Sequence, residues 1–240
     1  GQHPQVYFSP IKEPHFFNTD DSFRNVTDVD TYLQLFEGAG LEHLAVGEAS
    51  TWYLYSETAV PEIERFTGGD ARYVVCLRNP VDMAYSLHAQ ILFSGNETIP
   101  DFCQAWSLQE ERAKGRKLPA LSNEKTHLQY FRACALGTLV ERLLKTVPRS
   151  RVHFVFLDDL SADGPSEFDK LLLFLSLPSQ QHSINFNAKN AAHAPRSRLI
   201  TQLIVFAAAL RRWLGLSRGL GILTCIRNLN KREAPRVKLD

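Results

Sequence analysis

Cysteine is scarce in this chain, and the few cysteines are scattered. The 240 residues contain four of them, with no Cys-x-x-Cys pair and no short His/Cys cluster: Cys76, Cys103, Cys134 and Cys225. This spacing excludes a disulfide framework and gives no sign of a structural zinc site. Cys76 lies inside an apolar run, where we expect it to behave as a small buried hydrophobe.

The chain also lacks a large net charge, a long uninterrupted apolar run and a visible signal peptide. A net charge of +1 excludes a nucleic-acid binder that works by bulk electrostatics, so any anion site must be local. Segment 196–224 is apolar, but Arg211-Arg212 and Arg218 interrupt it, which excludes a membrane-spanning helix there. We expect this segment to pack in the core, with contact to a membrane surface or a partner as the alternative.

The chain does alternate apolar runs with helical patterns. Its 44% apolar and 22% charged residues suffice for the core of one α/β domain. Short apolar runs predict buried strands at residues 44–48, 73–77 and 152–157. Helical spacing predicts helices at residues 28–37, 57–66, 81–93, 102–114, 126–146 and 166–174. This order favours a parallel sheet flanked by helices.

The strand at residues 73–77 runs directly into a phosphate-binding pattern. Arg78 follows it, Asn79-Pro80 begins the next helix, and Ser86 lies about two turns along that helix. Open α/β sheets bind ligands at the carboxyl ends of their strands. A guanidinium matches phosphate oxygens in geometry and charge, and a serine hydroxyl adds a further donor. We therefore expect an anion site formed by Arg78 and Ser86.

This Arg-Asn-Pro corner, with a serine eight residues after the arginine, resembles the 3'-phosphate-binding segment of sulfotransferases that use 3'-phosphoadenosine 5'-phosphosulfate (PAPS). Two earlier segments resemble the glycan-type and bacterial members of that family: Lys12-Glu-Pro-His-Phe-Phe17 and Gly47-Glu-Ala-Ser-Thr-Trp-Tyr-Leu54. The three motifs occur in the family's order, and weaker similarity continues to Pro178. The resemblance implies a P-loop-NTPase-like fold of three layers, and transfer of a sulfuryl group from PAPS to an acceptor hydroxyl, without a metal ion.

The chain departs from the family at one important point. Family members carry a Gly-rich loop that holds the 5'-phosphosulfate, shortly before the motif that contains His3-Pro4, and these 240 residues contain no such loop. The end of the chain resembles the lead-in to further helices. We therefore expect residues 1–240 to be one sulfotransferase domain that is incomplete at both ends, and a poor enzyme as it stands.

The resemblance also implies roles for particular residues. Glu13 is the expected general base, with His15 near the same acceptor and Lys12 as a further candidate. On an extended segment residues 13 and 15 would share one face, with residue 12 on the other unless the backbone turns at Pro14. Besides Arg78 and Ser86, a late basic cluster is expected to contact the nucleotide, chiefly through Lys189 and Arg196.

Other residues of these motifs have weaker expectations. Glu48 would contact the acceptor or order the cleft, and Ser50 stands where relatives carry a lysine. Trp52 and Tyr53 are candidates for stacking or for the core. Asp158 and Asp159 follow a strand and are expected to cap the next helix. Asn18 replaces an aspartate of some relatives. Phe16 and Phe17 are expected to anchor their segment in the core.

Two other functions remain open, and so do the acceptor and the compartment. A kinase-like P-loop protein would share the sheet but would need a Mg²⁺-binding Ser/Thr and Asp pair. A non-catalytic module with a decayed nucleotide site is the other alternative. The acceptor is expected to be a carbohydrate or another alcohol. The unpaired thiols favour the cytosol, whereas the sequons at Asn25 and Asn96 would suit the Golgi lumen.

Overall fold

The computed structural model describes residues 3–122, 125–179, 193–214 and 222–233. It divides the chain into two compact units. The first unit comprises Gly1–Arg78 and Leu136–Asn187, and the second comprises Asn79–Ala135 and Ala188–Asp240. The single domain expected over residues 1–240 stays a prediction.

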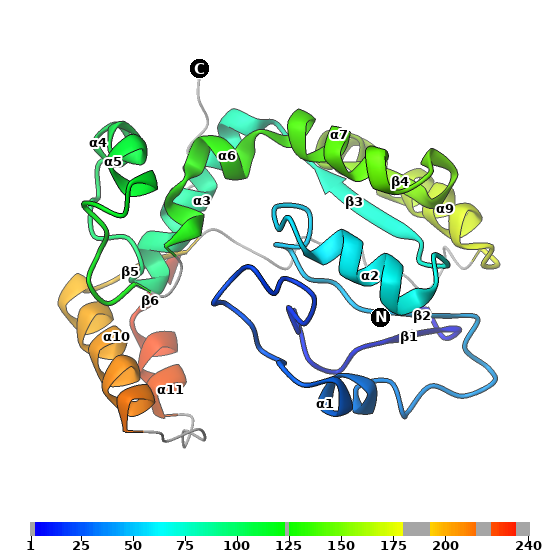
Figure 1. Cartoon of the computed structure of the whole chain (residues 1–240), viewed down its shortest axis with the longest axis horizontal. Helices are drawn as coiled ribbons and strands as arrows, with labels where there is room; N and C mark the ends of the chain where they lie inside the picture. Colours follow the sequence, from blue (N-terminus) through cyan, green and yellow to red (C-terminus); the bar gives the residue numbers. More distant parts are fainter. Residues whose placement is uncertain (1–2, 123–124, 180–192, 215–221, 234–240) are drawn as a thin grey trace. The chain divides into compact units, whose positions relative to one another are not determined.

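The first unit contains two pairs of parallel strands (Figure 1). β1 (Val6–Phe8) pairs with β2 (Ala45–Gly47), and β3 (Tyr73–Leu77) pairs with β4 (Val152–Phe156). Among the described residues, β2 has no second strand partner and neither has β3. All three predicted strands form, but two are shorter than predicted: β2 lacks one residue at each end, and β4 ends one residue early because α8 begins at Leu157. The prediction that the first of them is buried is wrong, because β2 contains no buried residue and Val46 is 52% exposed. The short strand β1 was not predicted.

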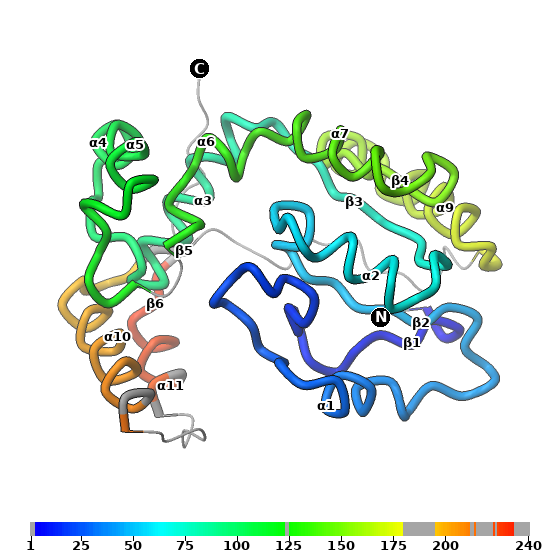
Figure 2. Tube along the Cα trace, viewed as in Figure 1, coloured from blue at the N-terminus to red at the C-terminus, as the bar shows by residue number. Residues whose placement is uncertain are grey.

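Helices connect and cover these strands, as the tube in Figure 2 traces. They are α1 (Val29–Gln34), α2 (Ala59–Thr67), α7 (Leu136–Thr146), α8 (Leu157–Ala162) and α9 (Gly164–Leu175), with a 3-10 turn at Arg149–Arg151. Asp28 begins α1, where its side chain accepts a hydrogen bond from Thr31 N at 2.8 Å. Gly68 ends α2 at φ +63°, a left-handed conformation that glycine adopts without strain.

Two hydrophobic clusters form the core of the first unit. One joins Phe17 to α1 and α2 through Val26, Tyr32, Leu35 and Ala59. The other packs β3 and β4 against α7 through Val60, Val75, Leu143, Val147 and Val152. Phe16 stacks on Tyr32 with a centroid separation of 4.3 Å. The predicted anchoring of Phe16 and Phe17 is thus confirmed.

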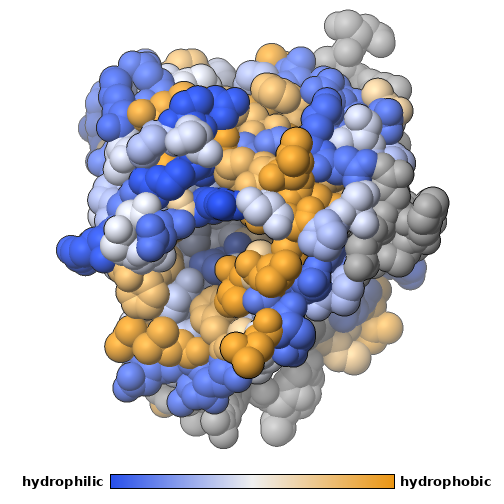
Figure 3. Space-filling model, turned by 90° about the vertical axis from the view of Figure 1, so that its right-hand side faces the viewer, coloured by the Kyte–Doolittle hydropathy of each residue, from blue (hydrophilic) through white to orange (hydrophobic). Residues whose placement is uncertain are grey.

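The prediction that β3 is buried on both faces is wrong. Alternate side chains of a strand point to opposite faces, and only Val75 is buried. Val74 on the other face is 42% exposed, and Cys76 is exposed rather than packed. The described residues thus cover one face of this strand. Apolar side chains also reach the surface on the face of the molecule drawn in Figure 3.

The second unit is mainly helical. It contains α3 (Pro80–Ser94), α4 (Phe102–Ser107), α5 (Gln109–Ala113), a 3-10 turn at Thr126–Leu128, and α6 (Tyr130–Cys134). The helices predicted at 102–114 and 126–146 are therefore wrong as single elements. Gln109 explains part of the interruption: its carbonyl accepts from Gln129 Nε2 at 3.1 Å, and its side chain accepts from Phe131 N at 2.6 Å. These tertiary contacts override the helical periodicity.

The apolar segment 196–224 forms α10 (Arg198–Trp213) and the start of α11 (Ile222–Leu229), next to the antiparallel pair β5 (His193–Pro195) and β6 (Lys231–Glu233). Ile204 and Val205 are buried, which confirms core packing for one face of α10. A side chain at Gly95 would lie 2.5 Å from Val205, so glycine permits this close approach. Leu199 is 79% exposed on the other face. No helix in the described ranges is long and apolar enough to span a membrane.

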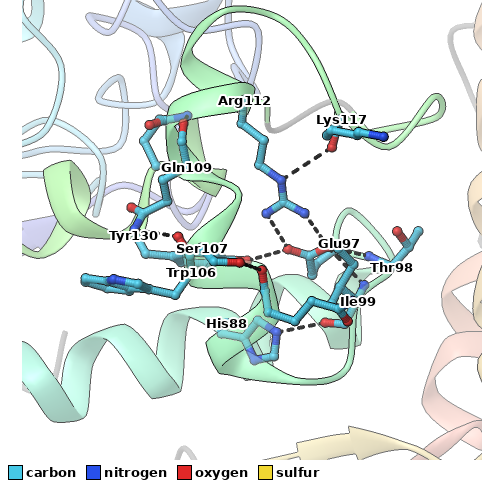
Figure 4. A network of polar contacts seen from close by, with 12 residues as sticks. His88, Glu97, Thr98, Ile99, Trp106, Ser107, Gln109, Arg112, Lys117 and Tyr130 are labelled. Carbon is cyan, nitrogen blue, oxygen red and sulfur yellow. Dashed lines mark hydrogen bonds and ion pairs between the residues drawn. The ribbon is translucent and has the colours of Figure 1, made fainter.

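A buried ion pair organises the second unit around Glu97 (Figure 4). Arg112 Nη1 and Nη2 donate to the two carboxylate oxygens at 2.7 and 2.9 Å, and neither side chain is exposed. The Tyr130 hydroxyl donates to Glu97 at 2.7 Å, and the backbone N–H groups of Thr98 and Ile99 donate at 2.8 and 3.0 Å. The carboxylate is therefore fully hydrogen-bonded, as a buried charge requires.

Candidate active site

The first motif forms an irregular loop after β1, not an extended segment. Glu13 and His15 have φ values of +54° and +50°, so the prediction of extended backbone is wrong here. Non-glycine residues rarely adopt this left-handed region, and such conformations occur often at functional sites. The two side chains nevertheless come together, with His15 Nε2 3.4 Å from Glu13 Oε2.

Residues 24–26 hold the carbonyl groups of this loop. The Asn25 side chain donates to the Glu13 carbonyl at 2.7 Å. The backbone N–H groups of Asn25 and Val26 donate to the Pro14 carbonyl at 3.1 and 2.9 Å. The Arg24 guanidinium donates to the carbonyls of residues 15 and 16. Every carbonyl from residue 13 to 16 therefore has a donor, which keeps the loop in one conformation.

The second motif holds the N–H groups of the same loop. Ser50 Oγ accepts from His15 N at 3.0 Å, and the Tyr53 hydroxyl accepts from Phe16 N at 3.0 Å. Both hydroxyls donate to the carboxylate of Glu48, at 2.8 Å from Ser50 and 2.5 Å from Tyr53. The Glu48 carboxylate is therefore connected to the loop through two hydroxyls, and the roles expected for Glu48 stay predictions.

The Glu13 carboxylate lies at the mouth of this loop. Its side chain is 26% exposed, and Lys12 Nζ lies 3.4 Å from Oε1. The backbone turns at Glu13, as its φ of +54° shows. The Thr51 hydroxyl contacts Oε2 at 3.5 Å. The His15 imidazole lowers the pKa of the Glu13 carboxyl below its usual 4.5, partial burial opposes this shift, and the Lys12 ammonium reinforces it. Glu13 is therefore ionised at neutral pH and accessible to a proton donor.

His15 is enclosed beneath Glu13. Its side chain has no exposed surface, and its ring lies 5.1 Å from Phe23 and 6.2 Å from Tyr53. Neither ring nitrogen makes a hydrogen bond with the described residues. The imidazole thus contacts Glu13 from the interior, and its role stays a prediction. Lys12, at 81% side-chain exposure, extends into solvent.

Arg78 belongs to the first unit and Ser86 to the second, so each residue is described within its own unit. Arg78 directly follows β3 and is partly buried, and its Nε is buried without a hydrogen-bond partner among the described residues. Asn79 caps α3, accepting from Val81 N at 2.9 Å, and Pro80 occupies the first turn as predicted. Ser86 is exposed on α3. An orphaned donor on an arginine fits an anionic ligand.

The late basic cluster is only partly described. Lys189 lies outside the described residues. Arg196 is exposed in the second unit, where its Nε donates to the Lys231 carbonyl at 3.0 Å and its backbone N–H to the Asn230 carbonyl at 2.7 Å. Its contact with a nucleotide stays a prediction.

Several other residues named in the sequence analysis lie in helix termini or in packing contacts. Asp158 and Asp159 lie in the first turn of α8 and make no capping hydrogen bond, so the predicted cap is wrong; a carboxylate there favours the helix dipole instead. Asn18 is buried and donates to the Phe23 carbonyl at 3.3 Å. Trp52 packs edge-on against Tyr55 with a centroid separation of 5.6 Å. No cluster of three metal-binding side chains occurs in the described ranges.

Sequence reasoning missed the residues that hold the loop. Arg24 and Asn25 belong to none of the three motifs that resemble sulfotransferases, and their contacts depend on how the chain folds back over residues 13–16. Ser50 was noted only as a missing lysine. A signal for it does exist, because Ser50 and Tyr53 are the hydrogen-bonding side chains at two and five residues after Glu48.

Known proteins of similar structure and sequence bear on this site. No protein-family model matches the chain. The sulfotransferase of Alicyclobacillus acidocaldarius superposes with a TM-score of 0.66 over 93% of this chain and 90% of that one, at 24% identity. The chain has the sulfotransferase fold. Human carbohydrate sulfotransferase 15 is 26% identical over 225 residues, which cover 76% of this chain but 37% of the relative's length.

These sulfotransferase relatives confirm two predictions. The α/β fold class is confirmed by the structural superposition. The family resemblance drawn from the three motifs is confirmed by the structural and the curated relative together. The roles of individual site residues stay predictions.

Proposed function

We propose that this protein is a sulfotransferase that uses PAPS as sulfuryl donor and Glu13 as general base. The observation that carries the proposal is the loop at residues 13–16, whose backbone groups are held by hydrogen bonds. It presents an ionised, partly exposed carboxylate, with His15 behind it and Lys12 beside it. At neutral pH such a carboxylate is in the form that can accept the proton of an acceptor hydroxyl. The sulfotransferase names of both relatives support the reaction class.

The protein's own groups supply the following steps. The acceptor O–H transfers its proton to the Glu13 carboxylate as the acceptor oxygen forms a bond to sulfur. The S–O bond to the 5'-phosphate breaks at the same time, and adenosine 3',5'-bisphosphate leaves with the electron pair. When bound, PAPS supplies the activated sulfuryl group. Arg78 would hold the 3'-phosphate, because its buried Nε has no other partner among the described residues. Ser86, Lys189 and Arg196 are further proposed nucleotide contacts.

The acceptor and the compartment belong to the same proposal. We take the acceptor to be a carbohydrate hydroxyl, which the name of the human relative supports. The cytosol is the proposed compartment, since all four cysteines are free. A shift in the gel mobility of the native protein after amidase removal of N-linked glycans would contradict the cytosol. Asn25 is the exposed sequon, whereas Asn96 is only 7% exposed.

The test measures transfer of radiolabelled sulfate from PAPS to a panel of glycans and simple alcohols. It uses the protein in its full cellular length, because these 240 residues contain no Gly-rich phosphosulfate loop. We expect transfer to a glycan, and we expect Glu13→Gln to remove turnover while nucleotide binding persists. Glu37→Gln, a change at an exposed glutamate of the first unit, is the matched control. Transfer by Glu13→Gln at the parental rate would refute the role of the base.

A further inference from the structure

The loop that carries Glu13 is held through a single carboxylate that does not touch it directly. Glu48 Oε2 accepts from Ser50 Oγ at 2.8 Å and Glu48 Oε1 from the Tyr53 hydroxyl at 2.5 Å. The same two hydroxyls accept the backbone N–H groups of His15 and Phe16, each at 3.0 Å. The Phe17 N–H lies 3.4 Å from the Tyr53 hydroxyl as well. Two hydrogen-bond relays, one through the Ser50 hydroxyl and one through the Tyr53 hydroxyl, therefore join the Glu48 carboxylate to the backbone N–H groups of residues 15–17.

The direction of these hydrogen bonds depends on the carboxylate. A hydroxyl has one proton and two lone pairs, whereas an ionised carboxylate only accepts. When Glu48 takes both hydroxyl protons, the lone pairs of Ser50 and Tyr53 are left to face the loop amides. Without that acceptor the hydroxyl protons would rotate freely and compete with the N–H groups. Hydrogen bonds to a charged group are also stronger than those between neutral groups.

The loop needs this support because its backbone is unfavourable. Two non-glycine residues, Glu13 and His15, occupy the left-handed region within three positions. Such conformations persist only where the surroundings over-determine them. Residues 24–26 hold the carbonyl side of the loop, and the Glu48 relays hold its amide side.

We infer that Glu48 is a positioning residue for the reaction, one that fixes the Glu13–His15 turn by orienting the hydroxyls of Ser50 and Tyr53. The importance of Glu48 for catalysis rests on the proposed function, but its effect on the conformation of the loop is independent of any activity. Both Glu48 oxygens are already engaged by hydroxyls, which distinguishes this carboxylate from Glu13, whose side chain remains open to an acceptor. Burial raises the pKa of Glu48, and the hydroxyls of Tyr53 and Ser50 oppose that shift.

Amide hydrogen exchange tests the inference directly on the 240-residue chain. Glu48→Ala should accelerate exchange at residues 15 and 16 by about two- to tenfold, the range that corresponds to the loss of one ordinary hydrogen bond. Exchange at Val75 in β3 should not change. Ser50→Ala should affect residue 15 alone, and Tyr53→Phe should affect residues 16 and 17.

The matched control is Glu64→Gln. Glu64 is another carboxylate of the first unit that accepts from a tyrosine hydroxyl, that of Tyr73 at 2.9 Å, but its contacts do not reach the loop. We expect it to leave residues 15–17 unchanged. Glu48→Gln keeps one acceptor oxygen and should restore protection at only one of the two relays. Unchanged exchange at residues 15 and 16 in Glu48→Ala, or equal acceleration throughout the first unit, would overturn the inference.

Kinetics of the protein in its full cellular length give the second readout. If sulfuryl transfer is observed, Glu48→Ala should lower kcat while leaving the KM for PAPS within about twofold, because only the Glu13 turn is displaced. A loss of turnover in Glu48→Ala without faster exchange would show direct catalysis and refute positioning. If no transfer is observed for the parent, the proposed function fails while the exchange result still decides the positioning.

Discussion

Replacing Arg112 with methionine should destabilise the second unit strongly. The substitution removes both hydrogen bonds from Arg112 to Glu97. The Glu97 carboxylate, which has no exposed surface, is then left without its cation. Breaking a buried ion pair on one side costs about 3 to 5 kcal/mol. Three donors remain on Glu97, from Tyr130, Thr98 and Ile99, so we expect the lower end, about 3 kcal/mol.

A double-mutant cycle separates this pair from ordinary packing. Glu97→Gln combined with Arg112→Met leaves no buried charge, so the double variant should be more stable than Arg112→Met alone. Tyr130→Phe removes one hydrogen bond to a charged group and should cost about 1.5 to 3 kcal/mol. Urea unfolding followed by circular dichroism measures each value, with the denaturant slope unchanged. A cost below about 1 kcal/mol for Arg112→Met, or additive single variants, would refute the reasoning.

Acid should weaken the same contact. Burial raises the pKa of Glu97, but Arg112, the Ile99 N–H and Tyr130 outweigh it, so the pKa lies below the usual 4.5. A carboxyl with a lowered pKa contributes stability that is present above about pH 4.5 and is lost as the pH falls through the lowered value. In Arg112→Met, burial without the cation raises the pKa of Glu97, so the carboxyl of the variant takes up a proton at higher pH than that of the parent. The stability difference between the parent and Arg112→Met should therefore shrink as the pH falls from neutral to below about 4.5. A difference that stays constant down to pH 3 would contradict this assignment.

Further predictions concern the candidate site. Arg78→Ala should weaken adenosine 3',5'-bisphosphate binding about ten- to a hundredfold by calorimetry, because a charge-assisted hydrogen bond is worth about 1.5 to 3 kcal/mol. Arg65→Ala changes an exposed arginine and should not weaken this binding. An equal loss of affinity in the two variants would refute the role of Arg78. Asn25→Ala removes the donor to the Glu13 carbonyl and should lower turnover without changing nucleotide affinity; unchanged turnover would contradict a holding role. Since the pKa of Glu13 is lowered, loss of its basic form should reduce the rate only below about pH 4.5, and an acid limb assigned to Glu13 near pH 6 would contradict that.

The sequence predicted the strands better than the helices. The strand at residues 73–77 was predicted with its bounds, because its apolar run ends at a clear Asn-Pro signal. The single helix expected at residues 126–146 does not form. Gln109 makes hydrogen bonds to residues 129 and 131, and such tertiary contacts cannot be predicted from helical periodicity. The exposure of Val74 also escaped prediction, since an apolar run shows which residues are hydrophobic but not which faces are covered.

The sequence indicated some residues of the candidate site but not its geometry. The first motif contains Glu13 and His15 and the second contains Glu48, and the structure brings the side chains of Glu13 and His15 within 3.4 Å. They meet through left-handed backbone, which no extended pattern implies. The positions of Arg24 and Asn25 follow from the fold of the loop and have no local sequence signal.

Calorimetric binding of adenosine 3',5'-bisphosphate compared with ADP, without magnesium, to the protein in its full cellular length decides whether this protein has a PAPS site. We expect tight binding that requires the 3'-phosphate and weakens in Arg78→Ala. Equal binding of the two nucleotides, or binding of neither, would contradict the proposal that this protein is a PAPS-dependent sulfotransferase.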